Sequence, residues 1–365
     1  MTIDNLKSPD LAAPHPATAD RPATAGRPAT APSAASTTDL LRLDDLHISV
    51  HHGAATAVRG ISLGIRPGEI VGLVGESGSG KTLTCRAALG VLPDGCIIDR
   101  GSITFAGRDL TTLSRRGWED VHGSHMGAVF QDPASYLNPS ITVGHQLAEV
   151  LRVKLGLSRR AARQRSVELF TAVGLHQPEH VFHQIPAELS GGMLQRVMIA
   201  IAISCDPELL VADEATTALD VTIQAEVIEL LRRLRAERGL AVLFVSHDLA
   251  VVAELCDRVV VFYAGEVVES GPAAEIIERP RHPYTQALLR VASVGDFRRR
   301  ELEVISGQPP QVGEDITGCR FAARCPAAAD ACRSGPIAPV TVDAQHEVRC
   351  VRAQEAWAAG ELAAR

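Results

Sequence analysis

The chain has 365 residues, of which 46% are hydrophobic and 22% are charged, and these values are ordinary for a soluble globular protein. The net charge is −7 and the pI is near 6.0, so nothing favours a nucleic-acid partner. No apolar stretch is long enough to span a bilayer, and the N-terminus lacks the basic segment and apolar core of a secretory signal. The composition therefore predicts a cytoplasmic protein that would reach a membrane only through partners.

Residues 1–38 are rich in Ala, Pro, Thr and Ser and contain a short repeat. Pro16–Ala19 recurs at Pro22–Ala25 and again at Pro28–Ala31. Such low-complexity sequence cannot bury enough apolar surface to fold, so it predicts a disordered tail. Folded sequence is expected to begin near Leu40.

Short apolar runs that alternate with helical patterns favour an α/β fold with a mostly parallel sheet covered on both faces. A helix is expected from Lys81 to about Leu89, and a helical pattern runs from about Gln146 to Val173. This block interrupts the alternation and indicates an inserted helical subdomain over about residues 134–206. The expected strands are Leu41–Val50, Val58–Ile65, Ile70–Val74, Ile103–Phe105, Leu209–Ala212, Ala241–Val245 and Val259–Phe262.

Residues 75–82 form the most informative motif of the chain. They follow the apolar run 69–74 and precede a predicted helix, which is the context in which a glycine-rich loop binds a polyphosphate. The glycines let backbone N–H groups approach the phosphates, Lys81 reaches the outer phosphates, and the Thr82 hydroxyl can ligate Mg²⁺. The predicted nucleotide-binding residues of this loop are Gly75, Glu76, Ser77, Gly78, Ser79, Gly80, Lys81 and Thr82.

Two further motifs complete a nucleotide site. The apolar run from Leu209 ends in Asp213, expected to hold Mg²⁺, and Glu214, expected to polarise the attacking water. Without the phosphate loop, a solvated acidic turn would be the better interpretation. A second anion-binding helix start is predicted at residues 190–192, where the alternative is a simple helix cap; its residues are Ser190, Gly191 and Gly192.

With these motifs in order, residues 40–350 resemble the ATP-binding subunits of ABC transporters, whose signature matches residues 190–193. The resemblance implies a mixed sheet core and ATP sandwiched between two such subunits, with the signature acting on the partner's ATP. It also implies that Gln131 senses the γ-phosphate and helps to hold Mg²⁺, that Asp220 belongs to the D-loop, and that His247 is the switch histidine. Catalysis would rest on Glu214, His247 and Lys81.

Three segments, 131–139, 216–221 and 281–285, look like the oligopeptide/dipeptide importer branch, which also contains nickel importers. The resemblance implies a second, related ATPase subunit as heterodimer partner, two membrane permeases, a peptide-binding protein outside the membrane, and a location on its cytoplasmic side. Nickel or another small solute is an alternative cargo. A soluble ABC-type ATPase acting on nucleic acid or ribosomes is a rival, as is a regulatory module with an inactive site.

Three positions depart from the family pattern. Ala215 stands where Pro is usual, and Leu194 stands where Arg is common. The third departure is the aromatic platform for adenine, because no Phe, Tyr or Trp precedes Phe105. The resemblance implies that this residue falls near His51 or His52, counting back from Lys81, and we assign the role to His52, whose imidazole stacks less strongly than a larger ring.

Four cysteines gather in a Pro-rich segment that is expected to form a separate extension, residues 291–365, after an ATPase domain of residues 39–290. A cytoplasmic chain should not keep structural disulfides, so a metal staple is favoured over free thiols. Four thiolates suit Zn²⁺ or an iron–sulfur cluster, and the spacing lacks the CxxC pairs usual for zinc. The family resemblance implies a [4Fe–4S] cluster on Cys319, Cys325, Cys332 and Cys350, with His346 as an alternative ligand.

Overall fold

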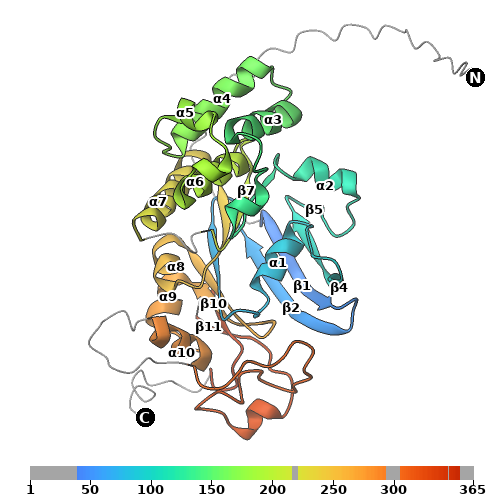
Figure 1. Cartoon of the computed structure of the whole chain (residues 1–365). Helices are drawn as coiled ribbons and strands as arrows, with labels where there is room; N and C mark the ends of the chain where they lie inside the picture. Colours follow the sequence, from blue (N-terminus) through green and yellow to red (C-terminus); the bar gives the residue numbers. More distant parts are fainter. Residues whose placement is uncertain (1–38, 216–220, 293–304, 344, 354–365) are drawn as a thin grey trace, which may run out of the picture. The chain divides into compact units, whose positions relative to one another are not determined.

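Two β-sheets and the helices around them make up the described part of this computed structural model, residues 39–215, 221–292, 305–343 and 345–353 (Figure 1). The smaller sheet is antiparallel and has the order β2-β1-β4-β5. Its strands are β1 (Leu41–Val50), β2 (Ala55–Ile65), β4 (Ile97–Phe105) and β5 (Arg108–Asp109).

The larger sheet is mixed and has the order β11-β12-β10-β9-β3-β8-β7-β6. The strands from β9 to β6 run parallel, whereas β10, β12 and β11 are joined by antiparallel pairings. The mixed sheet implied by the resemblance is therefore confirmed. The strands are β3 (Ile70–Val74), β6 (Met126–Val129), β7 (Leu209–Asp213), β8 (Ala241–Val245), β9 (Arg258–Tyr263), β10 (Glu266–Pro272), β11 (Val340–Asp343) and β12 (His346–Val348).

Ten α-helices occur among the described residues. The helical pattern predicted from Gln146 to Val173 is two helices, because Gly156 ends the first with a φ of 67° and Ser158 caps the second. None of the helices in the described ranges is long and apolar enough to cross a bilayer. The helices are α1 (Lys81–Ala88), α2 (Arg115–Val121), α3 (Val143–Leu155), α4 (Arg159–Ala172), α5 (Pro178–Phe182), α6 (Gly191–Ala202), α7 (Val221–Arg238), α8 (Leu249–Leu255), α9 (Ala273–Glu278) and α10 (Pro283–Ala292).

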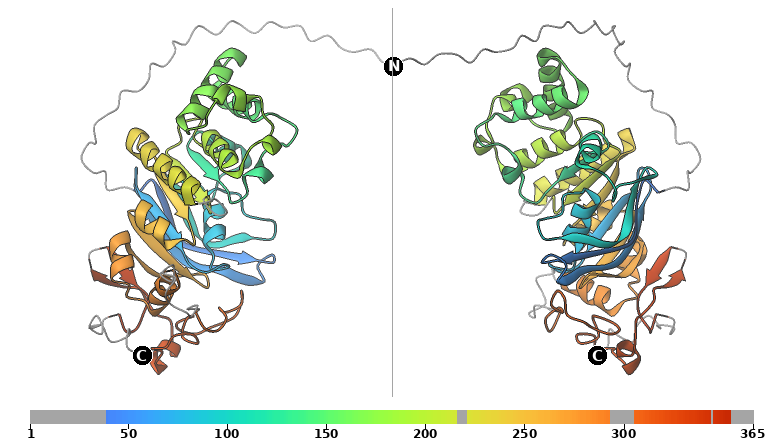
Figure 2. Two further views of the ribbon diagram at one scale, coloured as in Figure 1. Left: turned by 60° about the vertical axis from the view of Figure 1, so that its left-hand side comes forward. Right: turned by 90° about the vertical axis from the view of Figure 1, so that its right-hand side faces the viewer.

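The large sheet is buried on both faces because β3 and β8 are apolar at every position, and β7 and β9 at all but one. On β3, Ile70 and Val74 face a core that includes α3 to α10, while Val71 and Leu73 face a core shared with α1 and the small sheet. Side chains alternate between the faces of a strand, so a continuous apolar run suits a strand covered on both sides. In Figures 1 and 2, α3, α4 and α5 lie together at one end, and the segment after residue 305 lies at the other.

The C-terminal segment differs from the separate extension that the sequence predicts. Its strand β12 pairs with β10, and Glu269 opposes Val348 in that pairing. The Phe321 ring also packs on Tyr263 and Tyr284, with ring centroids 5.2 and 5.3 Å apart. The segment therefore adds strands to the large sheet and aromatic area to its core. The predicted tail 1–38 and residues 293–304, near the start of the predicted extension, lie outside the described residues.

Candidate functional site

The phosphate loop leaves the carboxyl end of β3 and enters α1. Gly75 has a φ of 145°, and a Cβ there would lie 2.1 Å from the carbonyl oxygen of Phe262, so only glycine fits. Gly80 has a φ of 107° and stands directly before α1. The backbone of the loop is thus held tightly against its neighbours, with its N–H groups at a helix start.

Lys81 is folded into this loop. Its Nζ donates to the carbonyl oxygens of Gly75, at 2.8 Å, and Glu76, at 2.9 Å. Burial lowers the pKa of Lys81, while the charges of Glu214 and Asp213 act in the opposite direction. The ammonium group therefore lies within the phosphate loop, and the carboxylates of Glu214 and Asp213 are close enough to act on its charge.

A pair of oxygen atoms suited to Mg²⁺ lies beside the loop. Thr82 Oγ1 donates to Asp213 Oδ1 over 3.2 Å, and Asp213 is only 5% exposed. Burial raises the pKa of Asp213, and the hydrogen bond from Thr82 opposes that shift. Hydroxyl and carboxylate oxygens are the ligands that Mg²⁺ prefers, so the predicted pair fits this ion.

Neighbouring parallel strands bring the remaining predicted groups to the same edge of the sheet. Val245 of β8 pairs with Leu73 on one side and with Asp213 on the other. His247 follows β8, and its Nδ1 lies 3.9 Å from Glu214 Oε2. Glu214 has a φ of 51°, an uncommon conformation for a residue other than glycine and one that clusters at functional sites.

Gln131 follows β6, the strand next to β7 in the sheet. Val129 pairs with Ala212, which places the end of β6 level with the end of β7. Gln131 itself is exposed. It therefore belongs to the same carboxyl edge of the sheet as Asp213 and Glu214.

The signature residues lie at the start of α6. Ser190 caps this helix, and its side chain accepts a hydrogen bond from the Met193 amide at 3.3 Å. Gly191 is exposed, and a Cβ at that position would meet no atom within 4 Å in the described part of the chain beyond its own helix. At Gly192 a Cβ would lie 2.8 Å from Ile223 Cγ2. The helix start is thus open on the side of Gly191, while the predicted D-loop residue Asp220 lies outside the described residues.

His52 lies in the turn between β1 and β2, with a φ of 57°. Its amide donates to the Gly95 carbonyl at 2.9 Å, and a Cβ on Gly95 would lie 3.5 Å from His52 Nε2. The ring therefore lies against Gly95. Its role as the adenine platform stays a prediction.

The structure adds two side chains to the phosphate loop that the sequence did not assign to it. The Tyr284 hydroxyl accepts a hydrogen bond from the Glu76 amide at 2.8 Å. Arg324 contacts the two carboxylate oxygens of Glu76 at 2.7 and 2.9 Å. Tyr284 belongs to the segment 281–285, whose sequence indicates the importer branch but no contact with the loop. Arg324 directly precedes Cys325.

The four C-terminal cysteines line one pocket together with His282 and Pro283 from the start of α10; they are Cys319, Cys325, Cys332 and Cys350. The Cys319 amide donates to the Cys332 carbonyl at 2.8 Å, which draws two of the segments together. Burial raises the pKa of Cys319 to about 12 and also raises the pKa of Cys325 and Cys350. Buried thiols of this kind ionise when a metal ion compensates the charge.

The spacing of these thiols bears on which metal they suit. Across the described residues, the one group of three ligand-type side chains whose ligand atoms lie within 4.8 Å of one another contains no cysteine. A tetrahedral zinc site has Zn–S bonds of about 2.3 Å and therefore sulfur atoms roughly 3.8 Å apart. The four thiols thus share a pocket, but no three of their sulfur atoms lie within 4.8 Å of one another as a tetrahedral zinc site would need.

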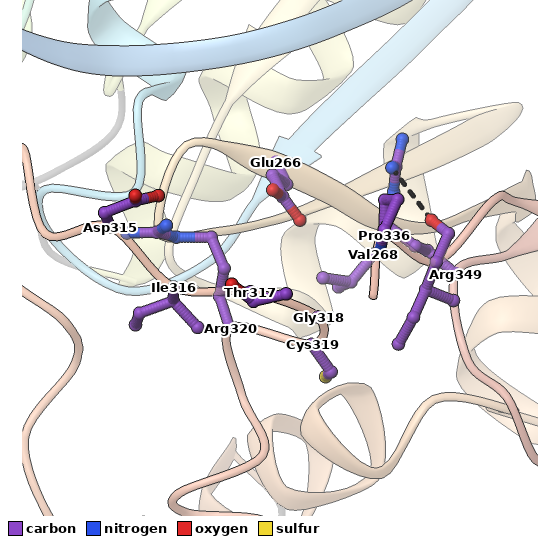
Figure 3. A pocket seen from close by; sticks show the side chains of 11 residues that line it. Glu266, Val268, Asp315, Ile316, Thr317, Gly318, Cys319, Arg320, Pro336 and Arg349 are labelled. Atoms are coloured by element: carbon purple, nitrogen blue, oxygen red, sulfur yellow. Dashed lines mark hydrogen bonds between the residues drawn. The ribbon is translucent and has the colours of Figure 1, made fainter. Parts of the chain in front are cut away.

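Cys319 also borders a second cavity of about 210 Å³. Figure 3 shows Arg320 beside Asp315 in this pocket, with Glu266 facing them and Cys319 at the edge. Burial raises the pKa of Glu266 and lowers the pKa of Arg320. The cysteine site is therefore bordered by a polar pocket on one side and by α10 on the other.

Comparisons with known proteins agree with this geometry. The ABC transporter family profile matches residues 58–217, and the profile of the oligopeptide/dipeptide transporter C-terminal region matches residues 268–332. The oligopeptide transport ATP-binding protein AppD of Bacillus subtilis is 44% identical over 82% of this chain and 92% of its own length. The protein OppD of the same organism is 44% identical over 79% of this chain and 81% of its own.

A solved structure gives the same fold. The chain matches cbiO1 from Clostridium perfringens, part of an ABC transporter complex, with a TM-score of 0.58 and 28% identity, over 66% of this chain and 91% of that one. Together with the phosphate loop, the signature helix and the two acids after β7, these likenesses establish an ATPase. The chain belongs to the ABC transporter ATP-binding subunits, in the oligopeptide/dipeptide transporter family.

Proposed function

We propose that this ATPase powers the uptake of di- and oligopeptides, as a peripheral subunit on the cytoplasmic side of a membrane. The observation that carries the proposal is the common edge of the large sheet, where Thr82, Asp213 and Glu214 meet beside His247. The names of the relatives AppD and OppD supply the cargo, because both are oligopeptide transport proteins.

The proposed chemistry is phosphoryl transfer to water. Lys81 and the loop N–H groups would stabilise charge on the phosphates, and Thr82, Asp213 and Gln131 would hold Mg²⁺. Glu214 would orient the attacking water or take its proton, and His247 would stabilise the γ-phosphate.

The open start of α6 supports a sandwich of two subunits. A phosphate could approach the Gly191 backbone from outside this chain, because among the described residues no atom beyond its own helix lies within 4 Å of a Cβ there. The signature would therefore act on the ATP of a second, related subunit through Ser190, Gly191 and Gly192. We assign the D-loop residue Asp220 to the same shared nucleotide site. Closure of the pair on ATP and opening after hydrolysis would drive two permeases, which receive peptide from a binding protein.

Four buried thiols in one pocket support a metal centre in the C-terminal segment. We assign Cys319, Cys325, Cys332 and Cys350 to a [4Fe–4S] cluster, as the family resemblance implies, and their shared pocket supports this assignment. Zinc is the alternative. When bound, such a centre joins distant points of the segment and acts as a staple.

Reconstitution with the neighbouring permeases and binding protein tests the proposal. ATP turnover that rises with added peptide, and not with nickel, is the expected result. Turnover stimulated by nickel alone would show that nickel is the cargo instead of peptide. Co-purification with RNA instead of membrane subunits would favour a soluble ABC-type ATPase that acts on nucleic acid or ribosomes.

A further inference from the structure

Arg324 connects the cysteine-rich segment to the phosphate loop. It lies between Cys319 and Cys325, and its side chain is 4% exposed. Its guanidinium contacts both carboxylate oxygens of Glu76, at 2.7 and 2.9 Å. The other donors reach the Tyr263 hydroxyl at 3.2 Å and the carbonyls of Ile305 and Ser306 at 2.9 and 3.0 Å. A guanidinium has five N–H donors, and here all five are used.

The other side of this contact is the backbone of the phosphate loop. The Glu76 amide donates to Tyr284, and the Glu76 carbonyl accepts from Lys81 Nζ at 2.9 Å. Glu76 is thus held through its side chain, its N–H and its carbonyl at once. The negative charge of its carboxylate also acts to raise the pKa of Lys81. A carboxylate placed here repels the phosphates of ATP unless a cation neutralises it.

The same elements border the cysteine pocket. The Phe321 ring, three residues before Arg324, packs on the rings of Tyr263 and Tyr284. His282 lines the cysteine pocket, and its Nδ1 accepts from the Tyr284 amide at 3.0 Å. Two paths of direct contact therefore run from the cysteines to Glu76, one through Arg324 and one through Tyr284.

We propose that Arg324 is a positioning residue of the nucleotide site, and that through it the state of the four-cysteine site sets the affinity for ATP. An intact cysteine site keeps the guanidinium on Glu76 and neutralises that carboxylate. When the site is disrupted, Arg324 leaves, and the exposed carboxylate weakens ATP binding. This proposal rests on the nucleotide site and the cysteine centre put forward above.

The first test is a double-mutant cycle on the full chain purified with its membrane subunits. ATP affinity is measured by competition with a fluorescent ATP analogue. Arg324→Gln should raise the Kd for ATP about tenfold, because Glu76 is left unneutralised. Glu76→Gln should bind ATP more tightly than wild type, and the double variant should return to within about twofold of wild type. Arg333→Gln, at an exposed arginine next to Cys332, is the matched control.

The second test perturbs the pocket from another segment. Cys350→Ser should raise the Kd for ATP severalfold in the wild-type background and leave it unchanged when Glu76 is already Gln. Unchanged affinity in Arg324→Gln, or a loss that Glu76→Gln fails to relieve, would overturn the positioning role. Wild-type affinity in Cys350→Ser would overturn the coupling. Metal analysis of the wild-type chain tests the identity of the cofactor separately. With either result, the double-mutant cycle of Arg324 and Glu76 still decides the positioning role.

Discussion

Thr82 Oγ1 and Asp213 Oδ1 lie 3.2 Å apart although 131 positions separate them in the sequence. The contact joins the first turn of α1 to the carboxyl end of β7. Since β7 pairs with β8 and β8 with β3, the sheet itself fixes this distance. The rigid scaffold thus brings a hydroxyl and a carboxylate together for one cation, and Glu214 follows at the next position.

Replacing Glu214 by Gln is expected to lower steady-state ATP hydrolysis by roughly 10²–10³-fold while ATP still binds, because the group that activates water is lost and the phosphate contacts are not. The variant should therefore accumulate the closed pair of subunits. Turnover and ATP binding are measured on the same preparation.

Glu208→Gln is the matched control for that experiment. Glu208 directly precedes the other end of β7 and pairs with His125 at 3.0 Å, away from the phosphate loop. Its turnover should equal that of wild type. Equal turnover in Glu214→Gln and wild type would remove Glu214 from the mechanism.

Replacing Lys81 by Ala is expected to weaken ATP binding by about tenfold or more, because a charged donor to the phosphates disappears. Calorimetric titration of the purified chain with Mg-ATP gives the change. Lys154→Ala controls for loss of an ammonium, since its Nζ contacts the Glu119 carbonyl in another region. Wild-type affinity in Lys81→Ala, with normal melting, would contradict the assignment.

The phosphate loop could be predicted because its chemistry is local. A buried strand, the glycines and Lys81 all occur between residues 69 and 89, and strand β3 is found at the predicted residues Ile70–Val74. The two acids were predictable for the same reason, since they end an apolar run. Each of these signals lies within one strand or one turn.

Contacts across the chain could not be predicted in this way. Arg324 and Glu76 are 248 positions apart, and no local pattern ties an arginine beside a cysteine to a glutamate in a loop. Strand β10 was missed because Glu266–Pro272 contains Gly and Pro, which are poor strand formers. Without β10 the partner of β12 was unknown, and the C-terminal segment was therefore expected to be separate.

Gly191→Ala is expected to leave stability unchanged or raise it by up to about 1 kcal/mol, because the new methyl meets no described residue beyond its own helix within 4 Å and alanine favours a helix. ATP hydrolysis by the subunit pair should nevertheless fall, because the methyl would block the partner's phosphates. Melting temperature and turnover are measured together. Gly335→Ala, also at an open position, should change neither quantity. Full turnover in Gly191→Ala would mean that the signature does not touch ATP.

Tyr284→Phe is expected to lower the free energy of unfolding by about 1 kcal/mol, since the Glu76 amide loses the acceptor that it meets at 2.8 Å. Urea denaturation should show a lower midpoint with an unchanged slope. Tyr136→Phe is the control, because Tyr136 is 50% exposed and its loss of a hydroxyl should have little effect. Identical midpoints for Tyr284→Phe and wild type would show that water replaces this contact at no cost.

Anaerobic purification followed by iron, sulfide and zinc analysis is expected to give about four irons per chain and a broad visible absorption band. Cys332→Ser should lose the band, because Cys332 is buried in the shared pocket, whereas Cys205→Ser should keep it, because Cys205 lies outside that pocket. One zinc and no iron would mean that the site holds zinc instead of a cluster. The sulfur atoms would then have to lie closer together than they do in this structure. Neither metal would mean that the pairing of β12 with β10 and the contacts of Arg324 and Phe321 hold the segment on the sheet without a staple.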